Sequence, residues 1–174
     1  MALDTYMILA NQYNSEADAL ADYEAVRKLY TDLGLIDTYD AAVLTRKNDG
    51  KVVIVKRVEE PTRHGAGRGL VAGLAIGLAF ALFPAISLGA GLIAGGAIGA
   101  GAGAVAGHLV GGMRRTDLKD LGELLDHGTS GLLVIAASDV EAKVDKAITR
   151  AQKRAKARVQ ADADAIKKEI DLAA

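Results

Sequence analysis

The 174-residue chain has no cysteine and no tryptophan, and only 4% of its residues are aromatic. Without cysteine, the chain cannot form disulfides, use a thiol in catalysis or bind a metal through sulfur. The formal net charge is −1 at pH 7, which argues against a general nucleic-acid-binding protein. The first residues also lack a basic segment followed by a long apolar run, so the sequence predicts no secretory signal.

Patterns that would indicate catalysis or a cofactor are lacking as well. The three histidines, His64, His108 and His127, are scattered without the spacing of metal ligands. The glycine-rich stretches contain no Gly-Lys-Ser/Thr, which a phosphate-binding loop would need. We therefore expect a protein that is not an enzyme, with no metal or other cofactor, no nucleic-acid partner and no small-molecule substrate.

The most distinctive feature is an apolar segment with a regular glycine period. From Gly69 to Met113 the chain contains no Asp, Glu, Lys or Arg, and Pro84 interrupts this run and predicts a turn. Two arms, 69–83 and 88–113, would form a helical hairpin. Glycine recurs at every fourth position on each side of the turn, at Gly65, Gly69, Gly73, Gly77, Gly91, Gly95, Gly99, Gly103, Gly107 and Gly111.

Such a glycine stripe implies close packing of helices. Each glycine inside a helix costs about 1 kcal/mol relative to alanine, so six on one stripe imply a partner surface that rewards close backbone approach. Two environments provide it: a lipid bilayer, or a protein assembly in which the hairpins are buried between subunits. We expect helix packing through these ten glycines, with self-association in either environment.

Basic residues flank the apolar run on both sides. Their distribution predicts that both ends of a membrane-inserted hairpin face the cytoplasm. The corresponding location is the bacterial inner membrane with the globular domain and both termini cytoplasmic; the alternative is a cytoplasmic assembly. We assign membrane-surface or orientation roles to the basic residues near the hairpin and in the tail, namely Arg63, Arg68, Arg114, Arg115, Lys143, Lys146, Arg150, Lys153 and Arg154.

The sequence around the hairpin predicts one α+β domain. Strands are expected at 5–13 and 131–138, and a helix at 15–34 begins with Ser15 as its N-cap and ends with Gly34 at the C′ position. Asn48-Asp49-Gly50 separates two further apolar runs and indicates a hairpin turn. Together with a short helix at 116–128, this order predicts a ferredoxin-like βαββαβ domain with strand order 4-1-3-2. The apolar hairpin would be inserted between the third strand and the second helix.

The residues after 138 are charged and rich in alanine. Their Ala, Val and Ile residues step by about 3.7 positions, which predicts a long C-terminal helix. This helix could bind anionic lipid through its basic face, or it could be a solvated helix packed on its own domain or a neighbour. The expected organisation is thus 1–60 with 116–138 as the globular domain, 61–115 as the inserted hairpin and 139–174 as the tail helix.

The ordered combination of "YDAAVLTRKNDGKVVIVKR", the Gly/Ala hairpin and "LGELLDHGTSGLLVIA" resembles the bacterial family of unknown function DUF1269, over about residues 4–138. The resemblance implies a membrane-linked, stress-related protein with no established activity. The expected function is therefore a non-enzymatic membrane-associated structural protein that self-assembles through its glycine-zipper helices. A soluble scaffold or shell subunit is the first alternative, and a membrane-permeabilising or pore-forming protein is the second.

Overall fold

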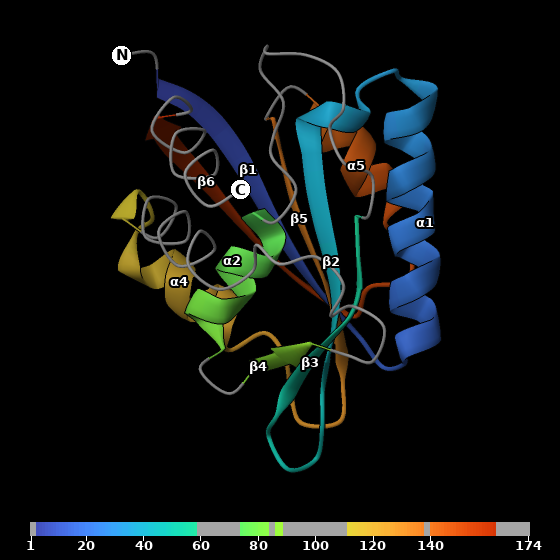
Figure 1. The fold of residues 1–174 in the computed structure, drawn as a ribbon, viewed down its shortest axis with the longest axis vertical. Coiled ribbons are helices and arrows are strands. Elements are labelled where there is room, and N and C mark those ends of the chain that lie inside the picture. Colours follow the sequence, from blue (N-terminus) through green and yellow to red (C-terminus); the bar gives the residue numbers. More distant parts are fainter. Residues whose placement is uncertain (1–2, 59–73, 84–85, 89–110, 138–139, 163–174) are drawn as a thin grey trace.

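Figure 1 shows the computed structural model of the protein, in which a twisted sheet lies between two layers of helices. The structure describes residues 3–58, 74–83, 86–88, 111–137 and 140–162. Helices α1 and α5 cover one face of the sheet, and α2 and α4 cover the other. In chain order the described elements are β1 (Leu3–Tyr13), α1 (Glu16–Asp32), a short 3-10 turn η1 (Ile36–Thr38), β2 (Tyr39–Arg46), β3 (Val52–Arg57), α2 (Leu74–Leu82), β4 (Ile86–Leu88), α4 (Arg115–Gly122), β5 (Ser130–Ala137), α5 (Glu141–Ala147) and β6 (Lys153–Asp162).

The sheet has six strands in the order β4-β3-β2-β5-β1-β6. The five longer strands pair antiparallel, and the three-residue strand β4 joins β3 in parallel. Strands β1, β2 and β5 form the centre, and their apolar residues are buried on both faces of the sheet. This explains why "YMILA", "AAVL" and "LLVIAA" are continuous apolar runs, because a strand between two helical layers has no solvent-facing side.

Several local predictions are confirmed. Helix α1 begins after Ser15, whose side chain accepts the backbone N–H of Asp18 at 3.1 Å. The helix is followed by Gly34 with a φ of 66°, the left-handed conformation that a glycine tolerates best. The turn between β2 and β3 contains Gly50 with a φ of 85°. The N-terminal helix, its two caps and the hairpin are therefore encoded locally in the sequence.

The predicted ferredoxin-like strand order is wrong. Numbered as the four expected strands, the observed order is 3-2-4-1, because β5 lies between β1 and β2 and pairs with both. The physical reason is burial: β5 and β2 are apolar on both faces and need central positions. In β3, by contrast, buried and half-buried residues alternate, which suits a strand further from the centre. The edge that we expected at β5 is thus covered by β2 of the same chain.

The predicted long C-terminal helix is also wrong. Residues Glu141–Ala147 form a helix of 7 residues, and Lys153–Asp162 form a strand of 10 residues. From Arg154 onward, the odd positions of β6 are small and apolar, as in Ala157 and Val159, and the even positions are polar, as in Lys156 and Arg158. This period of two fits a strand with one buried face better than it fits a helix. The many alanines of the tail also fit a helical period of about 3.7 residues, and this fit led to the wrong prediction of a helix.

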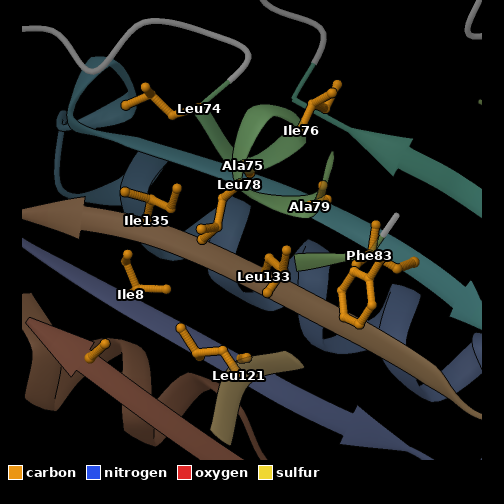
Figure 2. Close-up of a cluster of buried hydrophobic side chains, with 14 of the residues drawn as sticks. Ile8, Leu74, Ala75, Ile76, Leu78, Ala79, Phe83, Leu121, Leu133 and Ile135 are labelled. Carbon is orange, nitrogen blue, oxygen red and sulfur yellow. The ribbon is translucent and has the colours of Figure 1, made fainter. Parts of the chain in front are cut away.

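The described part of the first arm of the expected membrane hairpin, residues 74–83, is part of the globular domain. Helix α2 is 9 residues long and packs on β2 and β5, where Leu74, Leu78 and Ala79 lie among the buried side chains of the sheet (Figure 2). After Pro84 the chain continues as β4, which pairs with β3. Within the described ranges, no helix is long and apolar enough to cross a bilayer. The expected membrane-spanning arm at 69–83 is therefore wrong, and most of the second arm lies outside the described residues.

A buried carboxylate fixes where α2 begins. Asp40 of β2 is 2% exposed, and its Oδ2 accepts the backbone N–H of Ala75 at 2.8 Å. The free N–H groups at the start of a helix carry partial positive charge, so a carboxylate there is stabilising. Asp40 therefore anchors the apolar helix α2 on the sheet.

Candidate functional site

Charged side chains from several elements gather at the edge of the sheet formed by β6. The buried face of β6 packs with α4, and its polar face meets α5. A hollow of about 320 Å³ opens along this edge. It is lined by side chains from β1, α4, α5 and β6, namely Met7, Arg114, Asp117, Glu141, Lys156, Ala157 and Arg158.

A ladder of ion pairs joins α5 to β6. Glu141 and Asp145 lie one helical turn apart on α5, and they face the cations at alternate positions of β6. Arg158 Nη2 lies 2.8 Å from Glu141 Oε2, and Lys156 contacts both acids. The hydrogen bond to Asp145 raises the pKa of the Lys156 ammonium above its usual value. The basic character of this segment is thus largely balanced within the domain.

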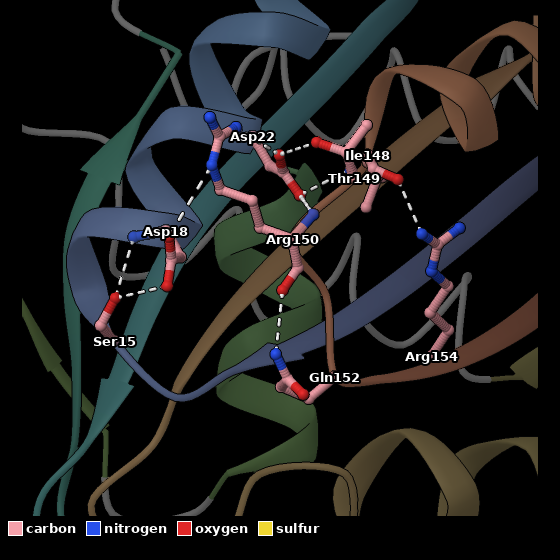
Figure 3. Close-up of polar contacts among 8 residues, drawn as sticks. All are labelled: Ser15, Asp18, Asp22, Ile148, Thr149, Arg150, Gln152 and Arg154. Carbon is pink, nitrogen blue, oxygen red and sulfur yellow. Dashed lines mark hydrogen bonds and ion pairs between the residues drawn. The ribbon is translucent and has the colours of Figure 1, made fainter.

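A second polar cluster holds the turn between α5 and β6 (Figure 3). Asp22 of α1 is 0% exposed, and its Oδ2 accepts the backbone N–H groups of Thr149 at 3.0 Å and Arg150 at 2.9 Å. The Arg150 guanidinium lies 3.3 Å from Asp22 Oδ1 and 3.7 Å from Asp18. A buried carboxylate is expected to be hydrogen-bonded and paired, and Asp22 meets both requirements.

Tyr13 lies beside this cluster. Burial raises the pKa of its phenol well above the usual range, and the negative charge of Asp22 raises it further. Its hydroxyl makes no hydrogen bond of regular geometry within the part of the chain that the structure describes. Tyr23, by contrast, donates its hydroxyl to the backbone carbonyl of Arg57 at 2.9 Å.

At the start of β6, Lys153 is held by an acid from the loop before β5. Lys153 Nζ lies 2.8 Å from Asp126 Oδ2, and Gln12 donates its amide to the same oxygen at 2.9 Å. These bonds, with that from Lys153 the largest cause, hold the pKa of the Asp126 carboxyl below its usual value. Arg46 of β2 donates to the carbonyl of Leu125 at 2.7 Å and holds the same loop.

The residues assigned to a membrane surface occupy different places. Arg150, Lys153 and Arg154 bond to neighbouring elements of the domain, through the Asp22 cluster, Asp126 and the carbonyl of Ile148. Arg114 precedes α4 and pairs with Asp117 at 2.9 Å. Arg115, Lys143 and Lys146 are exposed like the other four, but they make no ion pair within the described residues, whereas Arg63 and Arg68 lie outside the described residues.

Only two glycines of the predicted stripe fall within the described ranges. Gly77 is buried in α2, where the helix contacts the sheet. Gly111 is exposed, and a Cβ added there would meet no described atom within 4 Å. The other eight, Gly65, Gly69, Gly73, Gly91, Gly95, Gly99, Gly103 and Gly107, lie outside the described residues.

Sequence reasoning missed the acids that organise this edge. Asp22, Glu141 and Asp145 were not singled out, because their partners are distant in the sequence or depend on β6 being a strand. One signal was present: Asp22 falls on the otherwise apolar face of α1, between Ala19 and Val26, where a charge requires a partner. Within the described residues there is no group of three or more acids or histidines that could hold a metal ion.

Comparison with known proteins gives one match. A family described as "Protein of unknown function (DUF1269)" matches residues 66–168. The matched region begins later than the resemblance we identified and extends through β5, α5 and β6, so the charged tail is part of the family's domain rather than an addition to it. No curated protein and no solved structure matches the chain.

Proposed function

The chain belongs to the DUF1269 family of proteins of unknown function, and from that premise we propose that it is a non-enzymatic scaffold subunit whose copies associate through the glycine-periodic segment. The association would be between protein surfaces, in a cytoplasmic assembly. Of the functions considered, this one fits the geometry best, and pore formation is not needed to explain any described contact.

The observation that carries the proposal is the position of α2. This helix lies within the uncharged, glycine-periodic part of the chain, and its residues from Leu74 to Ala79 are all buried. The described part of this apolar, glycine-periodic sequence therefore packs against a protein surface, namely the sheet of the same chain. Residues 89–110 continue the same composition without a charge, so a protein surface of another copy is the partner that the proposal assigns to them.

The distribution of charge also supports a protein scaffold over a lipid-bound tail. Lipid headgroups attract basic side chains that are free, at about 1 kcal/mol for each residue near the surface. Arg150, Lys153 and Arg154 instead bond to groups of their own domain. Releasing them to a membrane would break contacts that hold β6 in place.

The substitution Gly111→Leu tests the proposal. Gly111 lies on the glycine stripe, is exposed and has open space at its Cβ position, so a leucine there disturbs no described contact within the chain. If the stripe packs closely on another copy, the added side chain keeps the two surfaces apart. We expect the assembly to become smaller by analytical ultracentrifugation, with the thermal unfolding midpoint of the domain unchanged.

Thr116→Leu is the matched control. Thr116 is an exposed residue of α4 that does not belong to the stripe, so the same added side chain should leave the assembly size unaltered. An unchanged size distribution for Gly111→Leu, or an equal loss for both variants, would be evidence against association through the stripe.

A further inference from the structure

The outer edge of β6 is suited to pairing with another strand. Within the described residues β6 has one neighbour, β1, to which it is paired from Lys153 to Asp162. The strand is long, continuous in register and free of proline, so its outer row of backbone N–H and C=O groups can serve as a template for another strand. The hollow between α4 and α5 leaves space along this edge.

Charge is the usual protection of such an edge, and here the protection is weakened. Lys156 and Arg158 would repel a second cationic strand if they were free. Both are held by Glu141, and Lys156 also by Asp145. These ion pairs reduce the net positive charge of the edge, but both cations remain partly exposed, so a like charge directly opposite either of them is still unfavourable.

The order of residues along β6 is self-complementary in the antiparallel direction. When two antiparallel strands pair about a two-fold axis, directly opposite residues point to the same face of the joined sheet. An axis at Val159 places Lys156 opposite Asp162, Arg158 opposite Gln160 and Ala157 opposite Ala161. An axis at Arg158 would place Arg158 opposite itself, and an axis at Ala157 would place Lys156 opposite Arg158. Only the first of these three registers has no like charges directly opposite each other. An axis at Gln160 also avoids like charges, but it pairs only residues 158–162 of β6, whereas the axis at Val159 pairs residues 156–162.

We propose that β6 pairs antiparallel with β6 of a second copy about a two-fold axis at Val159, joining the two sheets into one. The partner is a copy of this chain because the same strand carries both halves of the charge pattern. This contact uses the edge of the sheet opposite β4, the strand that precedes residues 89–110 in the sequence. It is independent of the association through the glycine stripe.

Cross-linking of the full chain tests the register directly. The natural chain has no cysteine, so introduced cysteines report without background. The double variant Arg158→Cys with Gln160→Cys should form disulfide-linked dimers on mild oxidation, because these positions face each other across the axis. Each single variant should remain mostly uncross-linked. Efficient dimers from Arg158→Cys alone would place the axis at Arg158 and overturn the proposed register.

Charge substitutions at Gln160 test the pairing without introducing cysteine. Gln160 is exposed, and its side chain makes no hydrogen bond or ion pair within the described residues, so its replacement should not affect folding. In the two-fold dimer each residue 160 lies opposite Arg158 of the other copy, so Gln160→Lys creates two like-charge pairs. This variant should raise the dimer Kd about tenfold, whereas Gln160→Glu should lower the Kd. Asn14→Lys and Asn14→Glu, at an exposed position between β1 and α1, should leave the Kd unchanged. A Kd that responds to neither Gln160 variant, or a failure of the double cysteine variant to cross-link, would refute pairing through β6.

The two modes of association can be separated. If Gly111→Leu leaves the assembly size unaltered while the double cysteine variant still cross-links, the proposed function fails and the β6 contact stands. If the double cysteine variant does not cross-link while Gly111→Leu reduces the assembly size, the β6 contact fails and the proposed function stands.

Discussion

At the scale of single residues, burial alone does not decide what a polar group contributes. Asp22 and Asp40 are both almost fully buried, and each accepts a backbone N–H from a distant segment. Asp22 fixes the turn before β6, and Asp40 fixes the start of α2. Each acid thus acts as a structural anchor, because removing a buried hydrogen-bonded carboxylate would leave its donors without a partner.

Tyr13 and Tyr23 offer a matched comparison of buried hydroxyls. Tyr23→Phe should lower the free energy of unfolding by about 1 kcal/mol, because the carbonyl of Arg57 loses its donor. Tyr13→Phe should leave the free energy of unfolding unchanged or raise it, because its hydroxyl is buried beside Asp22 without a regular hydrogen bond in the described structure. Urea denaturation followed by circular dichroism measures both. A larger loss for Tyr13→Phe than for Tyr23→Phe would show that the Tyr13 hydroxyl is bonded in solution.

Asp126 gives a pH-dependent test. Its pKa in the folded protein lies below the usual value of about 3.9, so the stabilisation from its bond with Lys153 is fully present above that pH. The stabilisation is lost as the pH falls through the depressed folded pKa. Lys153→Met should therefore raise the Asp126 pKa toward the usual value, which carboxyl NMR titration would measure. Lys28→Met, on the exposed face of α1, should leave it unchanged. An Asp126 pKa that Lys153→Met does not raise would contradict the bond.

At the scale of elements, the packing of the loop before β5 depends on a glycine. A Cβ at Gly131 would lie 2.6 Å from Cδ2 of Leu125, a buried side chain of that loop. The absence of a side chain at Gly131 therefore allows the loop to lie directly against the first residues of β5. The same residue type has a different role at Gly111, where the Cβ position is open.

Gly131→Ala should lower the free energy of unfolding by about 1–3 kcal/mol, because Leu125 must move from a packed position. Gly111→Ala should have little effect on the folded domain. In the double variant Gly131→Ala with Leu125→Ala, the total loss should be smaller than the sum of the single losses, because the clash disappears together with the larger side chain. Fully additive losses would show that Leu125 does not contact Gly131 in solution.

At the scale of the whole molecule, the domain covers both faces of its sheet with described helices. Replacing residues 89–110 by a Gly/Ser linker of equal length should therefore leave the domain folded. The same replacement should abolish the assembly through the glycine stripe. Thermal unfolding and ultracentrifugation on one sample separate these results. A linker variant that does not fold would show that the segment belongs to the domain's own core.

The sequence predicted what short-range patterns encode and failed where distant segments compete. Ser15, Gly34 and Gly50 marked the ends of α1 and the β2–β3 turn, because caps and tight turns depend on neighbouring residues. Strand order depends on which strand is most apolar on both faces, and this comparison favours β5 for the centre. The identity of β6 as a strand was hidden because alanine has a high intrinsic helix propensity, and only burial against α4 makes it suitable for the inner face of this strand. The Asp22 and Glu141 contacts could not be predicted before β6 was placed.

The position of β1 has a consequence for synthesis on the ribosome. Its two neighbours in the sheet both come from the last third of the chain, since Ile8 lies opposite Ile135 of β5 on one side and Ala157 of β6 on the other. The first strand to leave the ribosome therefore waits, on the order of ten seconds at ordinary translation rates, for the last strands that complete its pairing. During that time its "YMILA" run has no native strand partner. The nascent chain should thus depend on chaperones until its C-terminal segment emerges, and chains that end before β5 should aggregate.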